Sequence, residues 1–425
     1  MAGLTESGVA ALELEKVSSK VPALFDRGDK FYSTIEKRDV EVISSRDMRL
    51  PLELRPGGYF GHFDPDGGSM GPGGAPVFDK AVTNAAHLKL GIQFTKKAEW
   101  STNDGRKAVL NAFRHLMAKS MSEFRVQCEA ACMTSGGGIV GTPSGVAGGG
   151  TGGGNIWTLN TPGDGFNARL IRFGQPLSVF ATDGTTKRAE EAVVNFVDYP
   201  NKIIHTLAVG GTTVTSAAAT DTLRLSGLAG GTAPTSIYGV PYHHSSASSG
   251  YWLGLNRATV PEIRANSVNA AGAFALPYAR LAVNKVGDRL GEDAVGKMTA
   301  WMHPCQKQAY EELGQSISVI NKTAKDEGLN QYFNDNMQMA GMPVMTSFRW
   351  DKTRIDFVNA SVWGRSELKP AGLYDVEGRK LFEARDGDGA ILTSQLFFIV
   401  ASFNLFVNNP AACSYIYGLT VPSGY

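Results

Sequence analysis

The sequence predicts an α+β fold with an inserted β-rich domain, and three observations carry this prediction. A helical pattern of apolar residues runs without interruption through residues 104–133. Short apolar stretches separated by glycine, threonine, serine and aspartate fill residues 156–250, which is typical of a small β-sandwich or barrel. Strand and helix patterns then mix through residues 251–425 without the regular alternation of a parallel α/β sheet.

The chain carries almost no net charge. It has 425 residues, enough for two or three domains, and 43% of them are apolar, which permits a substantial core. Its 41 basic and 40 acidic residues leave a formal net charge of +1. A dedicated nucleic-acid binder needs a strong basic excess to displace counterions from phosphates, so the composition argues against that class. Near-neutrality also allows many copies of one chain to pack closely without long-range repulsion.

Neither a secretion signal nor a membrane span is expected. Residues 1–17 are acidic and lack a basic start followed by an apolar run. The most apolar stretch, residues 396–407, is interrupted by Ser402 and Asn404. It is far shorter than the roughly 18–20 apolar residues that a spanning helix needs.

The segments that precede the long helix are predicted to form extensions. Residues 1–37 carry too little apolar surface to fold alone, so we expect an N-terminal arm that lies on another surface. Residues 38–56 and 85–99 alternate apolar and polar side chains as strands do, and the stretch 56–76 between them is rich in glycine and proline. The pattern predicts a long hairpin with a flexible tip over residues 38–100.

An isolated two-stranded ribbon is marginal in water, so this hairpin needs a surface to lie on. A neighbouring subunit would provide one. A floppy surface loop or an active-site lid is the alternative that these residues leave open. The tip residues expected to contact a neighbour are glycines and aromatics: Gly57, Gly58, Tyr59, Phe60, Phe63, Gly67 and Gly68.

The long helix, residues 104–133, is the clearest element. Asn103 or Asp104 can cap its start, and its length corresponds to roughly 45 Å. Its apolar positions recur in steps of three and four residues, and those expected to pack are Leu110, Phe113, Met117, Met121 and Phe124. A coiled-coil seam is the rival interpretation, but the pattern is short for one. Residues 134–155 are rich in glycine, serine and threonine, so a flexible linker is expected there. A phosphate-binding loop is the alternative, but the segment lacks the Gly-Lys-Ser/Thr ending of such loops.

The rest of the chain is predicted to combine helices with strands. The expected helices are residues 275–291 and 304–313. The expected strands are residues 297–302, 344–346, 355–358, 390–407 and 414–419.

No set of residues predicts catalysis, a metal or a cofactor. The seven histidines and four cysteines lack metal-binding spacings, and His243 and His244 would face opposite ways in an extended chain. No nucleophile is accompanied by a base and an orienting group. Aspartate pairs beside glycines are typical of solvated turns, with weak calcium binding as the alternative. These are Asp64, Asp66, Asp386 and Asp388.

The order of the elements resembles that of tailed-bacteriophage major capsid proteins, whose fold is shared with encapsulin shells and the floor of herpesvirus capsids. Three segments carry the resemblance most specifically: MTAWMHPCQKQAYEEL (298–313), GMPVMTSFRWDKT (341–353) and FEARDGDGAILTSQLFFIVASFNLFVNNPAACSYIYGL (382–419). The first is an apolar strand that enters a proline-led helix, and the second contains a Gly-Met-Pro-Val turn. Each motif alone is weak, and the order and spacing across most of the chain carry the assignment.

The resemblance implies a division of the chain. Residues 38–100 would be the extended loop that reaches over an adjacent subunit, residues 101–155 the peripheral domain with its spine helix, and residues 251–425 the axial domain with the returning peripheral strands. Residues 156–250 have no counterpart in compact members, so we expect an inserted, surface-exposed β domain. A lysine–asparagine crosslink from the loop tip is not expected, because no lysine lies between Lys37 and Lys80.

The function implied is that of a major capsid protein. It would self-assemble through hexamers and pentamers into the icosahedral shell that encloses the double-stranded DNA genome of a tailed phage. An encapsulin-like compartment shell is the alternative. Expected partners are other copies of the chain, a portal protein, a separate scaffolding protein and the enclosed DNA, contacted non-specifically; a decoration protein is a further candidate. The expected location is the virion, with assembly in the host cytoplasm and no membrane contact.

Overall fold

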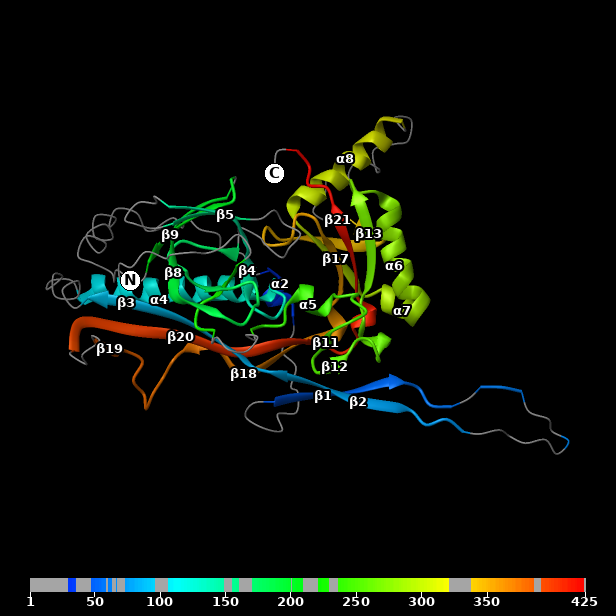
Figure 1. Ribbon diagram of the computed structural model, residues 1–425, viewed down its shortest axis with the longest axis horizontal. Coiled ribbons are helices and arrows are strands. Elements are labelled where there is room, and N and C mark those ends of the chain that lie inside the picture. Colours follow the sequence, from blue (N-terminus) through cyan, green and yellow to red (C-terminus); the bar gives the residue numbers. More distant parts are fainter. Residues whose placement is uncertain are drawn as a thin grey trace.

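The computed structural model is an elongated α+β molecule (Figure 1). It describes residues 30–35, 47–58, 60–62, 66, 73–95, 106–148, 155–159, 170–199, 201–208, 221–228, 236–320, 338–385 and 391–423.

The predicted long helix and the long closing strand are confirmed, and they lie together. Helix α4 (Arg106–Cys132) contacts strands β3 (Ala86–Thr95) and β20 (Ile391–Val407). Strand β20 is the centre of its sheet: β3 pairs along one edge, and β18 (Trp363–Leu373) followed by β19 (Phe382–Arg385) pair along the other. A single long strand thus ties together segments that lie far apart in the sequence.

The hairpin forms, but with a different second strand from the one predicted. Strand β1 (Asp47–Arg55) pairs antiparallel with β2 (Val77–Asn84), whereas the alternating segment assigned to residues 85–99 pairs with β20. The prediction was wrong because β2 buries only Ala81 and Thr83 and so lacks an apolar alternation. The alternation of β3 reflects one face packed on the core, as in any half-buried sheet strand.

Seven strands between residues 139 and 225 form one sheet. They are β4 (Ile139–Gly141), β5 (Pro143–Gly148), β6 (Asn155–Leu159), β7 (Pro176–Phe180), β8 (Lys187–Asp198), β9 (Ile203–Ala208) and β10 (Thr222–Leu225). The order is β4-β10-β7-β8-β9-β6-β5. Because β4 and β5 are separated only by Thr142 yet occupy opposite ends of this order, the sheet curls until its edges meet. We call it the barrel; it shows that residues 134–155 are more than a linker.

The barrel shares its interior with the rest of the molecule. Trp157 and Leu177 of the barrel belong to the same buried apolar cluster, here the main core, as Phe124 of α4. Arg172, in the segment that leads into β7, forms an ion pair with Glu123 of α4 at 2.5 Å. The barrel is therefore attached to α4, and its buried side chains extend the main core.

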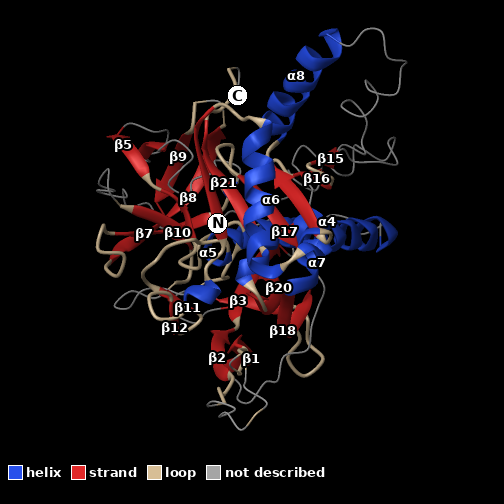
Figure 2. Cartoon of the chain, turned by 90° about the vertical axis from the view of Figure 1, so that its right-hand side faces the viewer, coloured by secondary structure: helices blue, strands red, loops and turns tan. Residues whose placement is uncertain are grey.

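The second large sheet has six strands in the order β13-β21-β17-β14-β16-β15. They are β13 (Asn266–Gly272), β14 (Met298–Met302), β15 (Gln338–Met339), β16 (Met342–Thr346), β17 (Ile355–Asn359) and β21 (Ser414–Leu419). Helices α6 (Leu276–Leu290), α7 (Glu292–Val295) and α8 (Pro304–Ile320) accompany it, and α8 projects from the body (Figure 2). The predicted helices and strands of this region are confirmed. Helix α6 buries Ala279, Ala282, Val283 and Val286, while Leu281 and Leu290 are exposed.

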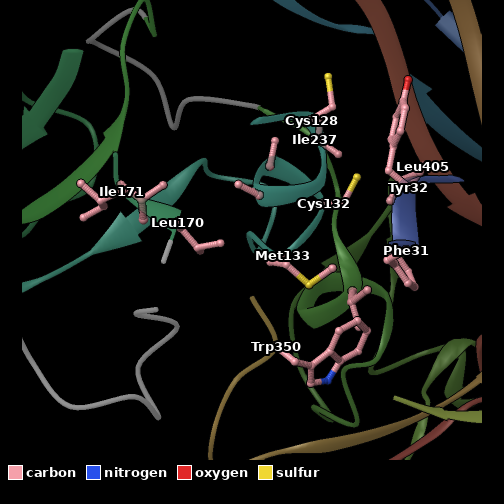
Figure 3. Packing of buried hydrophobic residues seen from close by; sticks show 14 of the residues in the cluster. Phe31, Tyr32, Cys128, Cys132, Met133, Leu170, Ile171, Ile237, Trp350 and Leu405 are labelled. Carbon is pink, nitrogen blue, oxygen red and sulfur yellow. The ribbon is translucent and has the colours of Figure 1, made fainter. Parts of the chain in front are cut away.

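The end of the predicted N-terminal arm lies inside the molecule. Helix α2 (Lys30–Thr34) places Phe31 and Tyr32 in the main core, near Cys128 and Cys132 of α4 (Figure 3). The Phe31 ring is 1% exposed. Its edge-to-face partners are three tryptophans, with ring-centroid distances of 5.3 Å to Trp301, 5.4 Å to Trp350 and 5.7 Å to Trp363. Residues 30–35 of the predicted arm thus pack within the main core, while residues 1–29 and 36–37 lie outside the described residues.

A glycine permits the closest backbone contact next to the barrel. Helix α5 (Val240–His243) starts where a Cβ on Gly239 would lie 2.1 Å from the Cys132 carbonyl oxygen and 2.4 Å from that of Thr134. Gly239→Ala is expected to lower the free energy of unfolding by about 1–3 kcal/mol, because backbone atoms cannot rotate away. Urea unfolding would measure this. Gly296→Ala, where a Cβ meets nothing within 4 Å, should leave the stability unchanged.

Candidate assembly surface

The base of the hairpin is anchored on its own chain. The platform, residues 251–263, carries the short strands β11 (Tyr251–Trp252) and β12 (Leu255–Asn256). The half-buried leucines of β1 pack against its buried residues; they are Leu50, Leu52 and Leu54. The Val82 N–H donates to the Leu253 carbonyl at 2.8 Å, and Arg55 pairs with Glu262 at 2.6 Å. The apolar face of β1, expected to await a neighbour, is thus covered within the subunit.

Beyond this base the hairpin leaves the body (Figure 1). Phe60 is fully exposed, Phe78 is 67% exposed and Val77 is 46% exposed. Covering exposed apolar side chains of this kind with another surface lowers the free energy. Of the predicted tip residues, Gly57, Gly58 and Phe60 are described here, while Tyr59, Phe63, Gly67 and Gly68 lie outside the described residues.

Two of the predicted glycines have a clear physical role where the hairpin narrows. A Cβ on Gly57 would lie 2.5 Å from the Pro76 nitrogen. Gly58 has a φ of +104°, a conformation that other residues rarely adopt, and its N–H donates to the Gly74 carbonyl at 3.0 Å. These glycines bring the two arms together before the tip.

The spine-helix residues predicted to pack are only partly described. Phe124 is 2% exposed and Met121 is half-buried against the main core. Helix α4 runs through Leu110, Phe113 and Met117, whose side chains lie outside what the structure describes. Met121 and Phe124 therefore both contact the main core.

A second exposed apolar surface lies at the opposite end of the long axis, where β18, β19 and β20 meet (Figure 1). Its exposed side chains, here the far-end surface, are Tyr374, Val376, Leu381, Ile391 and Leu392. Exposed apolar residues that cluster in this way are typical of interaction sites. Sequence reasoning missed the surface, because only the pairing of β20 with β18 and β19 brings these scattered residues together.

A buried polar cluster surrounds Asp356 of β17. Asp356, 1% exposed, accepts hydrogen bonds from His244 Nδ1 and Trp350 Nε1, both at 2.8 Å, and from Arg354 at 2.6 Å. The Arg354 guanidinium lies 4.0 Å from the Tyr415 ring centroid. Burial alone would raise the pKa of Asp356, but Arg354 and His244 outweigh it and lower this pKa to about 2. No substrate can reach so deeply buried a group, so its role is structural.

The described part of the chain holds no group of three or more histidine, cysteine or acidic side chains that could bind a metal. All four cysteines are free and buried. Of the predicted aspartate pairs, Asp66 is described, in an exposed turn, while Asp64, Asp386 and Asp388 lie outside the described residues. No helix within the described ranges is long and apolar enough to cross a membrane.

The sequence matches no protein-family model and no curated protein. The structure is similar to that of a chain in the Cyanophage A-1(L) capsid asymmetric unit, with a TM-score of 0.55, 10% identity, and coverage of 94% of this chain and 95% of that one. A chain of the empty GTA particle capsid has a TM-score of 0.48 at 11% identity, covering 98% and 100% of the two chains. The SrpI encapsulin of Synechococcus elongatus PCC 7942 has 0.46 at 10% identity, covering 98% and 97%.

The first of these likenesses, which extends over nearly the whole of both chains, shows the fold. The chain therefore has the fold of that capsid chain, the HK97-like capsid fold.

Proposed function

We propose that this chain is the major capsid protein of a tailed phage, and that it assembles through pentamers and hexamers into the shell around a double-stranded DNA genome. The observation that carries the proposal is the placement of two exposed apolar surfaces at opposite ends of a capsid-fold subunit, the hairpin tip and the far-end surface. Contacts between different surfaces of identical copies close into rings when the rotation between them permits.

In the proposed contact, the hairpin tip of one copy lies on the far-end surface of the next. Phe60 and Phe78 would supply large apolar side chains, and Tyr374 and Leu381 would receive them. The aromatic row behind the far-end surface continues inward, with ring-centroid distances of 5.8 Å between Tyr374 and Phe382 and 6.0 Å between Phe382 and Phe398. Side chains that are already held in place by packing lose little conformational entropy on binding, and this favours association.

The division of labour we propose follows the fold. Strands β1 and β2 act as the extended loop, α4 with the β20 sheet as the peripheral domain, and the six-stranded sheet as the axial domain around which rings form. The barrel is the inserted domain. Portal and scaffolding proteins, and DNA contacted non-specifically inside a virion, are the proposed partners. The same subunit contacts would serve an encapsulin-like compartment, and the contents of the particles, DNA or a cargo protein, distinguish the two.

The proposal predicts that the hairpin tip is needed for assembly and not for folding. Replacing residues 59–73 by an Asn-Gly turn should leave the thermal unfolding midpoint unchanged, since the base stays anchored through Leu253 and Glu262. Electron micrographs and sedimentation should then show few or no closed particles. Phe173→Ser, which removes a 77% exposed aromatic outside both surfaces, is the matched control and should assemble normally. Normal shells from the shortened chain would refute the assigned contact.

A further inference from the structure

One buried histidine connects the hairpin platform to the central strand. The indole N–H of Trp252 donates to Nδ1 of His243 at 3.0 Å, and Nε2 of the same ring lies 3.2 Å from the Leu405 carbonyl of β20. An indole N–H can only donate and a carbonyl can only accept. The ring must therefore accept at Nδ1 and donate from Nε2, which makes His243 the neutral tautomer with both nitrogens in use.

Trp252 is the centre of the surface on which the hairpin rests. It is fully buried among the platform residues that hold the leucines of β1, and the next residue, Leu253, accepts the hydrogen bond from Val82 of β2. The path from β20 to the hairpin thus runs through His243, Trp252 and Leu253. Whatever displaces Trp252 also disturbs the base of the hairpin.

We propose that His243 is an acid-sensitive anchor of the hairpin. A proton taken from solvent by Nδ1 would turn the only acceptor of the Trp252 indole in this contact into a donor, so that two N–H groups would face each other. The hydrogen bond between Trp252 and His243 then breaks and the two side chains separate. As a result, the platform and the hairpin base detach from β20. Loss of the proton restores the acceptor and closes the contact.

The charged neighbours of His243 reinforce this behaviour. His244 follows it directly in the chain, and its pKa is raised to about 9, since Cys413 and Asp356 outweigh the opposing effect of burial. Arg257 approaches from the platform, where its guanidinium donates to the Tyr242 carbonyl at 3.0 Å. The hydroxyls of Tyr238 and Tyr242 are neutral at and below pH 7. Behind His244, Arg354 donates to the His244 carbonyl and Asp356 pairs with the His244 ring. A charge on His243 would thus lie beside the cations His244 and Arg257, both of which oppose it.

The direction of the pH effect follows from these surroundings. Burial, and after it the charge of His244, lower the pKa of His243 in the closed state to about 3. In the open state the ring regains an ordinary pKa near 6.5. Because the closed-state pKa is depressed for a base, closure is fully favoured above about pH 6.5 and weakens progressively as the pH falls toward 3. In a shell, under the proposed function, acid would loosen the intersubunit contact of the hairpin.

Hydrogen exchange on the full chain tests the anchor. At pH 5 the opening of residues 77–84, corrected for intrinsic exchange, should be about 25-fold more frequent than at pH 7. Residues 355–359 of β17 serve as the internal reference and should show a much smaller change. Both measurements use the same assembly state, checked by sedimentation, so the result does not depend on whether shells form.

Two variants separate the anchor from general acid sensitivity. His243→Asn keeps an acceptor near the Nδ1 position, and His243→Gln keeps a donor near Nε2; neither side chain titrates, so the 25-fold response should disappear. His205→Gln, on strand β9 of the barrel, should retain it. An equal response in residues 77–84 and 355–359 of the unaltered chain, or a response that survives in a folded His243 variant, would overturn the proposal.

Discussion

Phe31→Ala is expected to lower the free energy of unfolding by about 3–5 kcal/mol, the usual cost of removing a fully buried aromatic side chain. The ring is 1% exposed and touches Trp301 of β14, Trp350 and Trp363 of β18. Trp301 belongs to the six-stranded sheet and Trp363 to the sheet of β20, so the cavity would open where these two sheets meet. A short N-terminal helix without its central anchor cannot close that cavity by itself.

Neighbouring contacts hold α2 in place and sharpen the expectation. Arg365 donates to the Tyr32 carbonyl at 2.9 Å, and its guanidinium lies 4.3 Å from the Tyr32 ring centroid. Guanidinium chloride unfolding of the subunit would measure the loss. Phe60→Ala is the matched control: the side chain is fully exposed, so stability should change by less than about 0.5 kcal/mol. Equal stabilities for the two variants would show that α2 does not hold the core together.

Asp356→Asn is expected to cost about 3–5 kcal/mol at pH 7, because it removes the negative charge from a buried cluster that keeps its cations. Arg354 donates to this carboxylate through two nitrogens, at 2.9 and 2.6 Å, and the His244 ring donates at 2.8 Å. An amide at this position leaves the guanidinium buried without its counterion. It also sets an amide N–H against one of the former donors.

The pH dependence distinguishes this cluster from a simple packing defect. Since the folded-state pKa of Asp356 is lowered to about 2, its stabilising contribution is complete above the ordinary value near 4 and is lost as the pH falls through 2. The stability difference between unaltered chain and variant should therefore shrink from pH 4 to pH 3. Asp288→Asn, an exposed change on α6, should have little effect at any pH. A constant difference down to pH 3 would contradict the charged cluster.

The strongest sequence patterns predicted elements well. The apolar spacing of residues 104–133 anticipated α4, and the apolar run near the C-terminus anticipated β20, because each buries a continuous face against one large surface. The Gly/Pro stretch 56–76 correctly marked the turn of a hairpin. Local patterns of this kind depend on neighbouring residues alone, so they can be read without knowledge of the partner.

What the sequence could not supply was pairing between distant segments. Strand β2 has mostly exposed side chains and lacks a clear apolar alternation. The segment of β3 alternates more clearly, so it was wrongly predicted to be the second strand of the hairpin. Residues 30–35 resembled an arm because three buried side chains make a weak pattern; their importance comes from tryptophans some 270–330 positions away. The far-end surface and the link from His243 to Trp252 likewise exist only once the strands have assembled.

The most direct test of the account is an electron cryo-microscopy map of the purified full-length chain after assembly. The account predicts closed particles built of five- and six-membered rings, with density for Phe60 and Phe78 of each hairpin on Tyr374 and Leu381 of the adjacent copy. A chain that stays monomeric at high concentration, or particles whose hairpins touch no neighbouring subunit, would contradict it.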